Sequence, residues 1–567
     1  MHVIQINGIT INHAGREIFR DLSWSIDDRA KIGLVGANGA GKSSLLKALS
    51  GEVIPTKGSI SIQRAIEIGY LPQEINLPAG TMYEAACQPA PELESLEYAL
   101  LEVEDRLSDP AVYNDSERLT AALEEQAALI EKLERFNPLK QASTVRELLT
   151  MLGFSAEQYD LDVRALSGGQ RKLVALARLA AWQPEILLLD EPDNHLDLDA
   201  KAALERFING YRGGVILVSH DRYLLDAVAQ GITELEAGKL THYVGNYSQY
   251  TVEREIRRIR QEQMHAAQQK TIARIEAAIK EWDMQAKVFE NERAARQASS
   301  RRKMLARMEE RGEIIEAVRD RQIMDLQIAG GRGSTKAVEL LDVTMGFGGD
   351  LLFTGINLLV RHGERVGLIG RNGAGKSVLF KLILGEHQPL TGVIKVGNST
   401  RIGYYAQQHE TLNAFADRTP IELVRDLVAV DEGGAVHHLL KFAFTYQQTR
   451  QPIRTFSGGE RSRLQLLALV LQKPNLLLLD EPTNNLDLAS AEALENALDE
   501  FEGAILTISH DRYFLDRIVD RIVELEDATL YETVGGYHDY VRQKAARLAA
   551  ERARREREAA KKKKQKA

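Results

Sequence analysis

The chain has 567 residues, of which 44% are hydrophobic and 27% are charged, and its formal net charge is −9. This composition is ordinary for a globular protein, and the length is enough for several domains. No segment approaches the ~20 apolar residues of a membrane-spanning helix, and no secretory signal is visible. The single cysteine, Cys87, excludes an intramolecular disulfide and any metal site built from cysteines alone. We therefore expect a cytoplasmic protein.

The dominant feature of the sequence is an internal repeat. Two glycine-rich loops, GANGAGKS from Gly36 and GRNGAGKS from Gly370, lie 334 residues apart. Further along the chain the offset between matching motifs falls to 290, so the first half carries a net insertion of 44 residues. A repeat of this length predicts two similar domains. We place the first at residues 1–245 and the second at residues 336–540, each an α/β domain with a P-loop.

Each glycine-rich loop follows an apolar strand and opens a helix. The glycines allow successive backbone N–H groups to converge on a phosphate, and the helix N-terminus adds a favourable dipole. Lys42 is expected to bridge the β- and γ-phosphates of a nucleotide, and Ser43 to ligate Mg²⁺. The candidate phosphate-binding residues are Gly36, Asn38, Gly39, Gly41, Lys42, Ser43 and Ser44 in the first copy, and Gly370, Asn372, Gly373, Gly375, Lys376 and Ser377 in the second.

The extra residues of the first half fall at about 91–136. Apolar residues recur there at helical spacing, and a turn at Ser108–Pro110 divides them, which predicts a helical arm. Residues 91–135 contain 13 acidic and 4 basic residues. We interpret this segment as an interaction arm that contacts a basic protein, and a solvated insertion without a partner is the alternative.

An SGG turn precedes a helix in each half. The serine and two glycines present a helix N-terminus to an anion. Since each half already has a phosphate-binding loop, a second anion site is useful only if it closes over the nucleotide of the other half. This predicts head-to-tail pairing, with Lys42 working beside Ser457 and Lys376 beside Ser167. The turns comprise Ser167, Gly168, Gly169 and Gln170, and Ser457, Gly458, Gly459 and Glu460.

A continuous apolar run ending in Asp-Glu follows each turn, as expected for a parallel strand buried on both faces. Asp190 and Asp480 at the strand ends are candidates to hold Mg²⁺. Glu191 and Glu481 are candidates for the general base that polarises the attacking water.

The motif Ser-His-Asp-Arg-Tyr follows the next apolar strand in each half and contains His220 and His510. We interpret each histidine as a hydrogen-bond donor to the γ-phosphate. A serine hydrolase is disfavoured, because the residues are adjacent in sequence and no nucleophile elbow is present. A purely structural histidine is the alternative.

The segment between the two domains, residues 246–335, is predicted to be a helical linker. From residue 246 to 311 it contains neither glycine nor proline. Two antiparallel helices of about 30 residues would each extend ~45 Å. Apolar residues at heptad-like spacing predict their seam, namely Ile272, Ile275, Ile279 and Trp282 on the first helix and Met304, Met308, Ile315 and Val318 on the second.

Two basic segments are candidates for contact with nucleic acid. The first surrounds the expected bend of the linker and has no acidic residue within it; the second is the tail, residues 541–567, with 12 Lys/Arg against 3 Asp/Glu from residue 542 onward. Such clusters can bind phosphates, although a passive spacer with a solvated face is the alternative. The tail is expected to be helical to about Glu558 and then disordered. The RNA-contact candidates of the linker are Arg293, Arg296, Arg301, Arg302, Lys303 and Arg307.

Together these motifs resemble the ATP-binding cassette superfamily over both halves, about two-thirds of the chain. Leu166–Gln170 is similar to the signature motif of that family, and Gln73 and Gln407 match its Q-loops. The resemblance implies ATP binding and Mg²⁺-dependent hydrolysis to ADP and phosphate, with Phe347 at the adenine-stacking position of the second cassette. The implied metal ligands are Ser43, Gln73, Asp190, Ser377, Gln407 and Asp480.

Two tandem cassettes, an arm in the first and a charged helical linker between them resemble the ABC-F class. The stretches EPDNHLD from Glu191 and EPTNNLD from Glu481 are similar to a run typical of that class. The resemblance implies a monomer with intramolecular cassette pairing that binds the ribosome near the exit tRNA site. The implied partners are rRNA, tRNA and, through the arm, a ribosomal protein, and the implied role is modulation of translation.

The sequence also departs from the class pattern. Asp193 replaces the usual threonine in the first copy, Asn485 replaces the usual histidine in the second, and His13 aligns with Phe347. We therefore expect the two ATP sites to differ in affinity or rate. The remaining alternatives are an ATPase subunit that energises a separate membrane transporter, and an ATPase that processes nucleic acid. The long linker disfavours the first, and the lack of zinc-binding cysteines and of a very long coiled coil disfavours the second.

Overall fold

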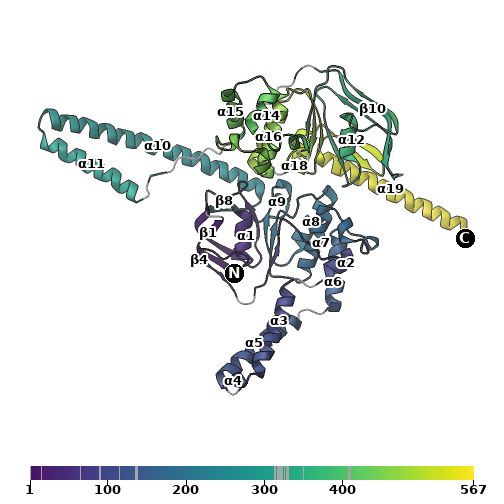
Figure 1. Cartoon of the computed structure of the whole chain (residues 1–567), viewed down its shortest axis with the longest axis horizontal. Helices are drawn as coiled ribbons and strands as arrows, with labels where there is room; N and C mark the ends of the chain where they lie inside the picture. The colour runs from purple at the N-terminus through teal and green to yellow at the C-terminus, as the bar shows by residue number, and fades with distance from the viewer. Residues whose placement is uncertain are drawn as a thin grey trace.

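The structure of the protein is a computed structural model. It describes residues 2–566 with gaps at 14–15, 64–65, 89–90, 114, 135–137, 312–313, 316–323, 325, 327, 329–330, 332, 349, 407–409 and 485. The two halves form two similar α/β domains that stack against each other (Figure 1). The predicted fold class, two tandem P-loop cassettes joined by a helical linker, is confirmed.

The first cassette is built on a six-stranded sheet in the order β5-β6-β7-β3-β8-β9 and a three-stranded sheet in the order β2-β1-β4. All strands of the larger sheet pair in parallel except β9. The central strand β6 has the sequence ILLLD and is buried along its whole length, as a strand covered on both faces must be. The strands are β1 (His2–His13), β2 (Arg16–Asp27), β3 (Lys31–Val35), β4 (Lys57–Ile62), β5 (Ile68–Leu71), β6 (Ile186–Asp190), β7 (Gly214–Val218), β8 (Gly231–Glu236) and β9 (Lys239–Val244).

Helices of the first cassette cover the larger sheet and form the arm. One apolar core lies between the two sheets and α1, and a second lies between the larger sheet and the helices α2, α6, α7 and α8. The helices are α1 (Lys42–Leu49), α2 (Met82–Cys87), α3 (Pro91–Ser108), α4 (Pro110–Tyr113), α5 (Ser116–Glu134), α6 (Pro138–Met151), α7 (Gly168–Ala180), α8 (Leu198–Gly210) and α9 (Arg222–Val228), with 3-10 turns at Ala156–Gln158 and Val163–Ala165.

The second cassette repeats this topology, with sheets in the orders β14-β15-β16-β12-β17-β18 and β11-β10-β13. Its strands are β10 (Lys336–Phe347), β11 (Asp350–Arg361), β12 (Arg365–Gly370), β13 (Thr391–Val396), β14 (Ile402–Tyr405), β15 (Leu476–Asp480), β16 (Ala504–Ile508), β17 (Arg521–Glu526) and β18 (Thr529–Val534). Its helices are α12 (Lys376–Ile383), α13 (Glu410–Asn413), α14 (Pro420–Leu427), α15 (Glu432–Lys441), α16 (Gly458–Leu471), α17 (Leu488–Asp499) and α18 (Arg512–Ile518), with 3-10 turns at Gln448–Arg450 and Ile453–Thr455.

The linker is a hairpin of two unequal helices, α10 (Tyr247–Val288) with 42 residues and α11 (Glu292–Glu310) with 19. The prediction of two helices of similar length was wrong, because Asn291 starts a new helix by accepting hydrogen bonds from the backbone of Arg293 and Ala294. The basic cluster therefore begins next to the bend, at Arg293, and continues along α11 to Arg307.

The predicted seam of the linker is confirmed in part. On α10 the side chain of Ile279 is buried, but on α11 the buried residues are Ala294 and Ala298. These small side chains allow the two backbones to approach closely. Met304 is 43% exposed, so its assignment to the seam was wrong, and Val318 lies outside the described residues.

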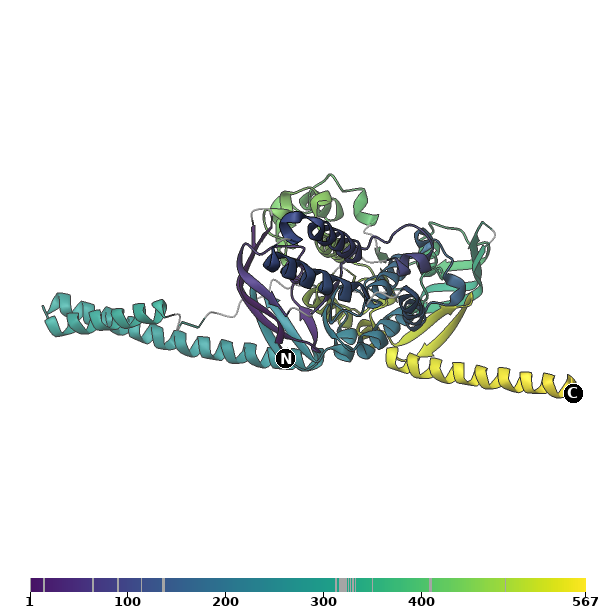
Figure 2. The same ribbon diagram turned by 90° about the horizontal axis from the view of Figure 1, so that it is seen from below.

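Three helical extensions project from the cassette pair. The arm is a hairpin of α3 and α5, as predicted, and extends from the first cassette (Figure 1). The linker and the C-terminal helix α19 (Tyr537–Lys566) extend in opposite directions in both views (Figures 1 and 2). Helix α19 continues past the predicted end near Glu558. No helix in the described part of the chain is long and apolar enough to cross a membrane.

Candidate functional site

The two glycine-rich loops have nearly the same geometry. Gly41 and Gly375 precede α1 and α12, and each has φ of 100°, a conformation in which a Cβ would be strained. The Nζ of Lys42 donates to the carbonyl oxygens of Gly36 at 2.8 Å and Ala37 at 3.1 Å. Lys376 makes the matching bonds at 2.7 and 3.0 Å. Both lysines are thus held under a loop whose backbone can accommodate a phosphate.

The candidate metal ligands of the first cassette lie close together at the end of β6. Asp190 is buried, and burial raises the pKa of its carboxyl, while the Ser43 hydroxyl and the Lys42 ammonium oppose that shift. Among the described residues no group of three or more His, Cys, Asp or Glu side chains could hold a metal alone. One carboxylate and one hydroxyl fit Mg²⁺, which binds few protein oxygens and takes substrate phosphates and water as its other ligands. Asp480 and Ser377 occupy the same positions in the second cassette.

The two candidate general bases have different surroundings. Glu191 accepts hydrogen bonds from the side chains of Gln73 at 2.8 Å and Asn194 at 2.5 Å. Glu481 instead accepts one from the backbone N–H of His510 at 3.2 Å. Burial, reinforced by Asp480, raises the pKa of Glu481 to about 7. The pKa of Glu191 is also raised, by burial and then by Asp193 and Asp190.

Each motif histidine faces the glutamate of its own cassette. The Nε2 of His220 lies 3.8 Å from Glu191 Oε1, and that of His510 lies 3.7 Å from Glu481 Oε1. Burial, and then the charge of Lys42, lower the pKa of His220 to about 3, and burial lowers that of His510 well below its usual value. Both rings are therefore neutral near pH 7, and each can donate one hydrogen bond to a phosphate.

The SGG turns form the N-termini of α7 and α16. Ser167 and Ser457 each cap their helix through a capping box with the residue three positions later, Gln170 and Glu460. A Cβ on Gly169 would lie 2.5 Å from the carbonyl oxygen of His195, whereas one on Gly168 would meet nothing within 4 Å. Gly169 therefore packs against the EPDNHLD segment, and Gly168 faces open space.

The phosphate loop of each cassette contacts the other cassette. The Asn372 side chain donates to the carbonyl oxygen of His195 at 3.1 Å. The Asn372 backbone N–H also lies 3.5 Å from Asp197 Oδ2. In the mirror image of this second contact the Asn38 backbone bonds Asp487. Burial acts to raise the pKa of Asp487, but hydrogen bonds from Ser490 and from Asn38 outweigh it, so the pKa lies below its usual value. One cavity of about 1470 Å³ is lined by both phosphate loops and by both SGG turns. The structure thus brings the motifs together head to tail, as the duplicated anion sites predicted.

For four of the residues singled out in the sequence, the structure gives few or no side-chain contacts. Phe347 lines the cavity, is 51% exposed, and lies edge-on to His387 with ring centroids 5.7 Å apart. Gln407 and Asn485 lie outside the described residues, as does the side chain of His13.

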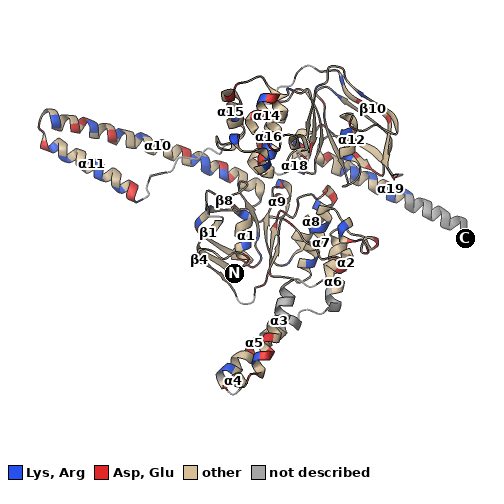
Figure 3. Cartoon of the chain, viewed as in Figure 1, with Lys and Arg blue, Asp and Glu red and all other residues tan. Residues whose placement is uncertain are grey.

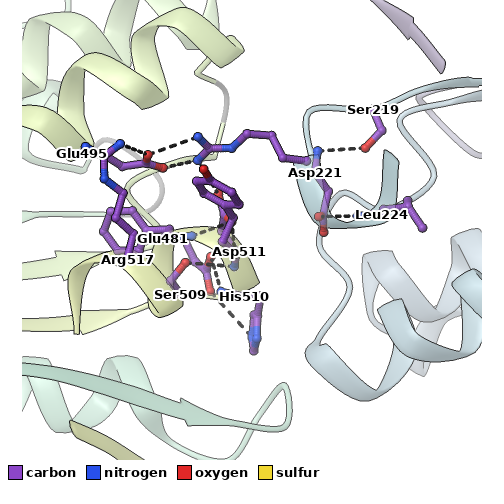
Figure 4. Close-up of polar contacts among 12 residues, drawn as sticks. Ser219, Asp221, Leu224, Glu481, Glu495, Ser509, His510, Asp511 and Arg517 are labelled. Carbon is purple, nitrogen blue, oxygen red and sulfur yellow. Dashed lines mark hydrogen bonds and ion pairs between the residues drawn. The ribbon is translucent and has the colours of Figure 1, made fainter. Parts of the chain in front are cut away.

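Sequence reasoning missed the residues that join the cassettes. Arg222 of the first cassette pairs with the fully buried Glu495 of the second, and its guanidinium lies 4.1 Å from the ring centre of Tyr513. The mirrored contacts join Arg512 to Glu205 at 2.9 Å and to the ring of Tyr223 at 4.4 Å. Figure 4 shows the two sides of this interface, with Ser219, Asp221 and Leu224 on the first cassette and Glu481, Glu495, Ser509, His510, Asp511 and Arg517 on the second. Both arginines belong to the repeated Ser-His-Asp-Arg-Tyr motif, and that repetition was a signal that could have revealed them.

The six basic candidates of the linker are all exposed along α11. Arg296 pairs with Glu292 at 3.3 Å, and Arg302 pairs with Asp283 of α10. Within the described part of the chain no carboxylate lies within ion-pair distance of the other four, Arg293, Arg301, Lys303 and Arg307. Figure 3 shows acidic and basic residues interspersed along the ribbon of the hairpin.

The chain is similar to known proteins in its family models, in its amino-acid sequence and in its fold. A family model described as ABC transporter (ABC_tran) matches residues 19–194 and 353–484, and a second model of that description (ABC_tran_Xtn) matches residues 233–325. The chain is 36% identical to the energy-dependent translational throttle protein EttA of Haemophilus influenzae over 93% of this chain and 92% of that protein. It is 34% identical to YfmR of Bacillus subtilis, an uncharacterized ABC transporter ATP-binding protein, over 97% and 85%. ABC transporter F family member 2 of Arabidopsis thaliana is 31% identical over 97% and 80%.

A solved structure with the same arrangement of two cassettes is the complex of the archaeal ribosomal stalk protein aP1 and the archaeal ribosome recycling factor aABCE1. It matches with a TM-score of 0.56 at 18% identity, covering 91% of this chain and 87% of that chain. At this identity the likeness supports the fold alone.

The two glycines of the first SGG turn provide a matched pair of variants. We expect Gly169→Ala to lower the midpoint of thermal unfolding, because the added Cβ would collide with the backbone of His195. Gly168→Ala should leave the midpoint within about 1 °C of the parent protein, since its Cβ would enter open space. Differential scanning calorimetry of both variants measures this. Equal midpoints for the two variants would contradict the packing of Gly169 described above.

Proposed function

The chain belongs to the ABC-F class of ATP-binding cassette ATPases, and on that premise we propose that it closes on two ATP molecules, binds the ribosome near the exit tRNA site and modulates translation through its linker. The observation that carries the first part of this proposal is the contact of each phosphate loop with the opposite cassette. A nucleotide in either site would touch both cassettes at once. Binding therefore favours the closed state, and loss of the γ-phosphate favours its opening.

Within each site, different residues bind the phosphates, accept the proton of water and donate hydrogen bonds to the γ-phosphate. Lys42 and Lys376 hold the β- and γ-phosphates, while Ser167 and Ser457 cap the helices whose N-termini face the nucleotide of the other cassette. Glu191 and Glu481 accept the proton of the attacking water. The neutral rings of His220 and His510 donate to the γ-phosphate. Bound Mg²⁺ would neutralise phosphate charge, held by Ser43 and Asp190 and by Ser377 and Asp480, with the glutamines at 73 and 407 as further ligands.

Ribosome binding is supported by the relatives and by the charge of the linker. The H. influenzae relative is named as a translational throttle, and it covers nearly the whole chain. The four basic side chains of α11 that lack a carboxylate partner among the described residues are exposed along the returning helix of the hairpin, starting with Arg293 beside its tip. RNA presents phosphates at regular spacing, so we infer that α11 contacts rRNA or tRNA. The basic tail is a second candidate, and ribosomes would place the protein in the cytoplasm.

The arm is the other proposed contact with the ribosome. Its surface is acidic, with Glu102, Glu104 and Asp105 exposed on α3. RNA phosphates would repel such a surface. We therefore infer that the arm binds a basic ribosomal protein.

The double variant Glu191→Gln, Glu481→Gln tests the core of the proposal. ATP binding should persist, and hydrolysis should slow by roughly 10²–10⁴-fold per lost base. In a sucrose gradient of cell extract the variant should migrate with ribosomes in ATP but not in ADP, since only ATP holds the cassettes closed. Absence from every ribosomal fraction, at low as well as high salt, would overturn the partner while leaving the ATPase assignment intact.

Neutralising the linker tests RNA contact. Changing Arg293, Arg301, Lys303 and Arg307 to Gln should weaken ribosome binding and flatten its dependence on salt, by up to about one unit of log–log slope per lost phosphate contact. Arg257→Gln with Arg258→Gln is the matched control, because these residues of α10 already pair with Glu253 and Glu262. An unchanged slope in the fourfold variant would show that α11 does not contact phosphates.

Neutralising the arm tests its proposed protein partner. Glu102→Gln, Glu104→Gln and Asp105→Asn together should weaken ribosome binding several-fold, because they remove charges that face a basic surface. Three exposed acidic residues of the second cassette, Glu500, Glu502 and Asp520, provide a control of equal charge change. Binding constants from a filtration assay with purified ribosomes compare the two sets, and equal affinities would contradict the role of the arm.

A further inference from the structure

A buried lysine crosses the interface between the cassettes. Lys201 lies on α8 of the first cassette with a side chain only 10% exposed. Its Nζ donates to the carbonyl oxygen of His510, in the second cassette, at 2.9 Å, and pairs with Asp221 of its own cassette at 2.9 Å. Lys201 also lines the cavity that contains both candidate ATP sites. A cation buried at this position must have a partner on each side to offset its loss of hydration.

The second cassette has no lysine at the corresponding position to make this contact with the first cassette. At the offset of 290 that relates the second parts of the halves, Ala491 stands in place of Lys201 and Thr483 in place of Asp193. Lys201 and Asp193 are thus both particular to the first cassette. Burial, and then the charge of Asp221, raise the pKa of Asp193, whereas Lys201 opposes that shift. The lysine and the extra aspartate therefore form a neutral addition to an interface that is otherwise nearly symmetric.

The carbonyl held by Lys201 belongs to a residue of the second ATP site. The backbone N–H of His510 donates to Glu481 Oε2 at 3.2 Å, and its ring faces the same carboxylate at 3.7 Å. Lys201 thus bonds the carbonyl of His510, while Glu481 accepts the N–H of the same residue from the preceding peptide. The lysine therefore restrains the backbone that carries the candidate phosphate donor and bonds the candidate base. In the first site the neutral methyl group of Ala491 cannot make this contact.

We propose that Lys201 is a positioning residue for the ATP site of the second cassette, which it completes from the first cassette through the backbone of His510. This inference rests on the proposed ATP hydrolysis. Its consequence is that docking also positions the base and the histidine of the second site, whereas those of the first site receive no such contact from the opposite cassette. The difference between the sites expected from Asp193 then has a physical cause, since Asp193 balances the charge of the lysine.

The competing explanation is that Lys201 only neutralises the buried carboxylates around it. The charged groups that face it are Asp193 and Asp221 from its own cassette and Asp511 from the other. Arg512 also faces Asp221 and would still pair with it if Lys201 were lost. A variant that removes one positive and one negative charge together therefore separates neutralisation from positioning.

The test compares Lys201→Met with the double variant Asp193→Asn, Lys201→Met in the full-length protein. Both retain side-chain volume, but only the double variant also removes a facing carboxylate. We expect the single variant to lower the thermal midpoint and the double variant to recover most of it. In both, kcat for ATP hydrolysis should fall about 10-fold while KM changes less than about 2-fold, because the loss affects the chemical step. A double variant with a recovered midpoint and parental kcat would overturn the proposal and leave Lys201 a structural residue.

To find which of the two ATP sites depends on Lys201, hydrolysis is measured in variants that retain only one candidate base. Glu191→Gln leaves turnover to the second site, and Glu481→Gln leaves it to the first. Adding Asp193→Asn and Lys201→Met should reduce the residual rate of hydrolysis several times more in Glu191→Gln, where the second site works, than in Glu481→Gln, where the first site works. Equal reductions would overturn the assignment of Lys201 to the second site. If parental hydrolysis were insensitive to both glutamate changes, the proposed function itself would fail, which is a result distinct from either of these.

Discussion

The structure depends on the buried charged contact between the two cassettes. Arg222 and Glu495 are almost completely buried, and the mirrored pair of Arg512 and Glu205 repeats the contact on the other side of a pseudo-two-fold axis. Removing Arg222 would leave Glu495 buried with Arg517, at 3.0 Å, as its remaining partner. The two pairs together fix one relative orientation of the cassettes. That orientation brings each phosphate loop to the EPDNHLD or EPTNNLD segment of the opposite cassette.

The same arginines connect this interface to the chemistry. Each directly follows the Asp of a Ser-His-Asp-Arg-Tyr motif, so the segment that carries His220 or His510 also carries the residue that reaches across. Because each arginine lies only two positions after the histidine, docking of the cassettes also constrains the position of that histidine. Lys201 adds a further coupling on one side only. This single asymmetric contact distinguishes the two sites within an otherwise nearly symmetric pair of cassettes.

In the proposed function, the linker and the other two helical extensions turn a small motion at the interface into a larger one at a distance. The linker is anchored in the first cassette, where Tyr247 and Tyr250 are buried at the start of α10. The tail is anchored in the second, where Tyr540 donates to Glu524 at 2.6 Å and Arg547 stacks on Tyr531. Since a helix of 42 residues is a rigid lever, rotation of the cassette that holds it moves the tip of the hairpin most. The basic cluster of α11 begins next to that tip, at Arg293.

The sequence by itself determined the two cassettes, their phosphate loops, signature turns, strand-end carboxylates and histidines, because each of these is a local pattern that recurs at a fixed offset. It also determined the head-to-tail pairing, since two anion sites per half have no other use. The uneven helices of the linker follow from the cap at Asn291, a local signal that the prediction of two similar helices overlooked. Only the tertiary structure decided the exposure of Met304 and the roles of Arg222, Glu495 and Lys201. These depend on which side chains meet when separately folded surfaces dock, and residues some 270 to 310 positions apart leave no periodic signal in the chain. Local spacing encodes elements and motifs, whereas the contacts between domains arise from shape and charge that exist only after both domains have folded.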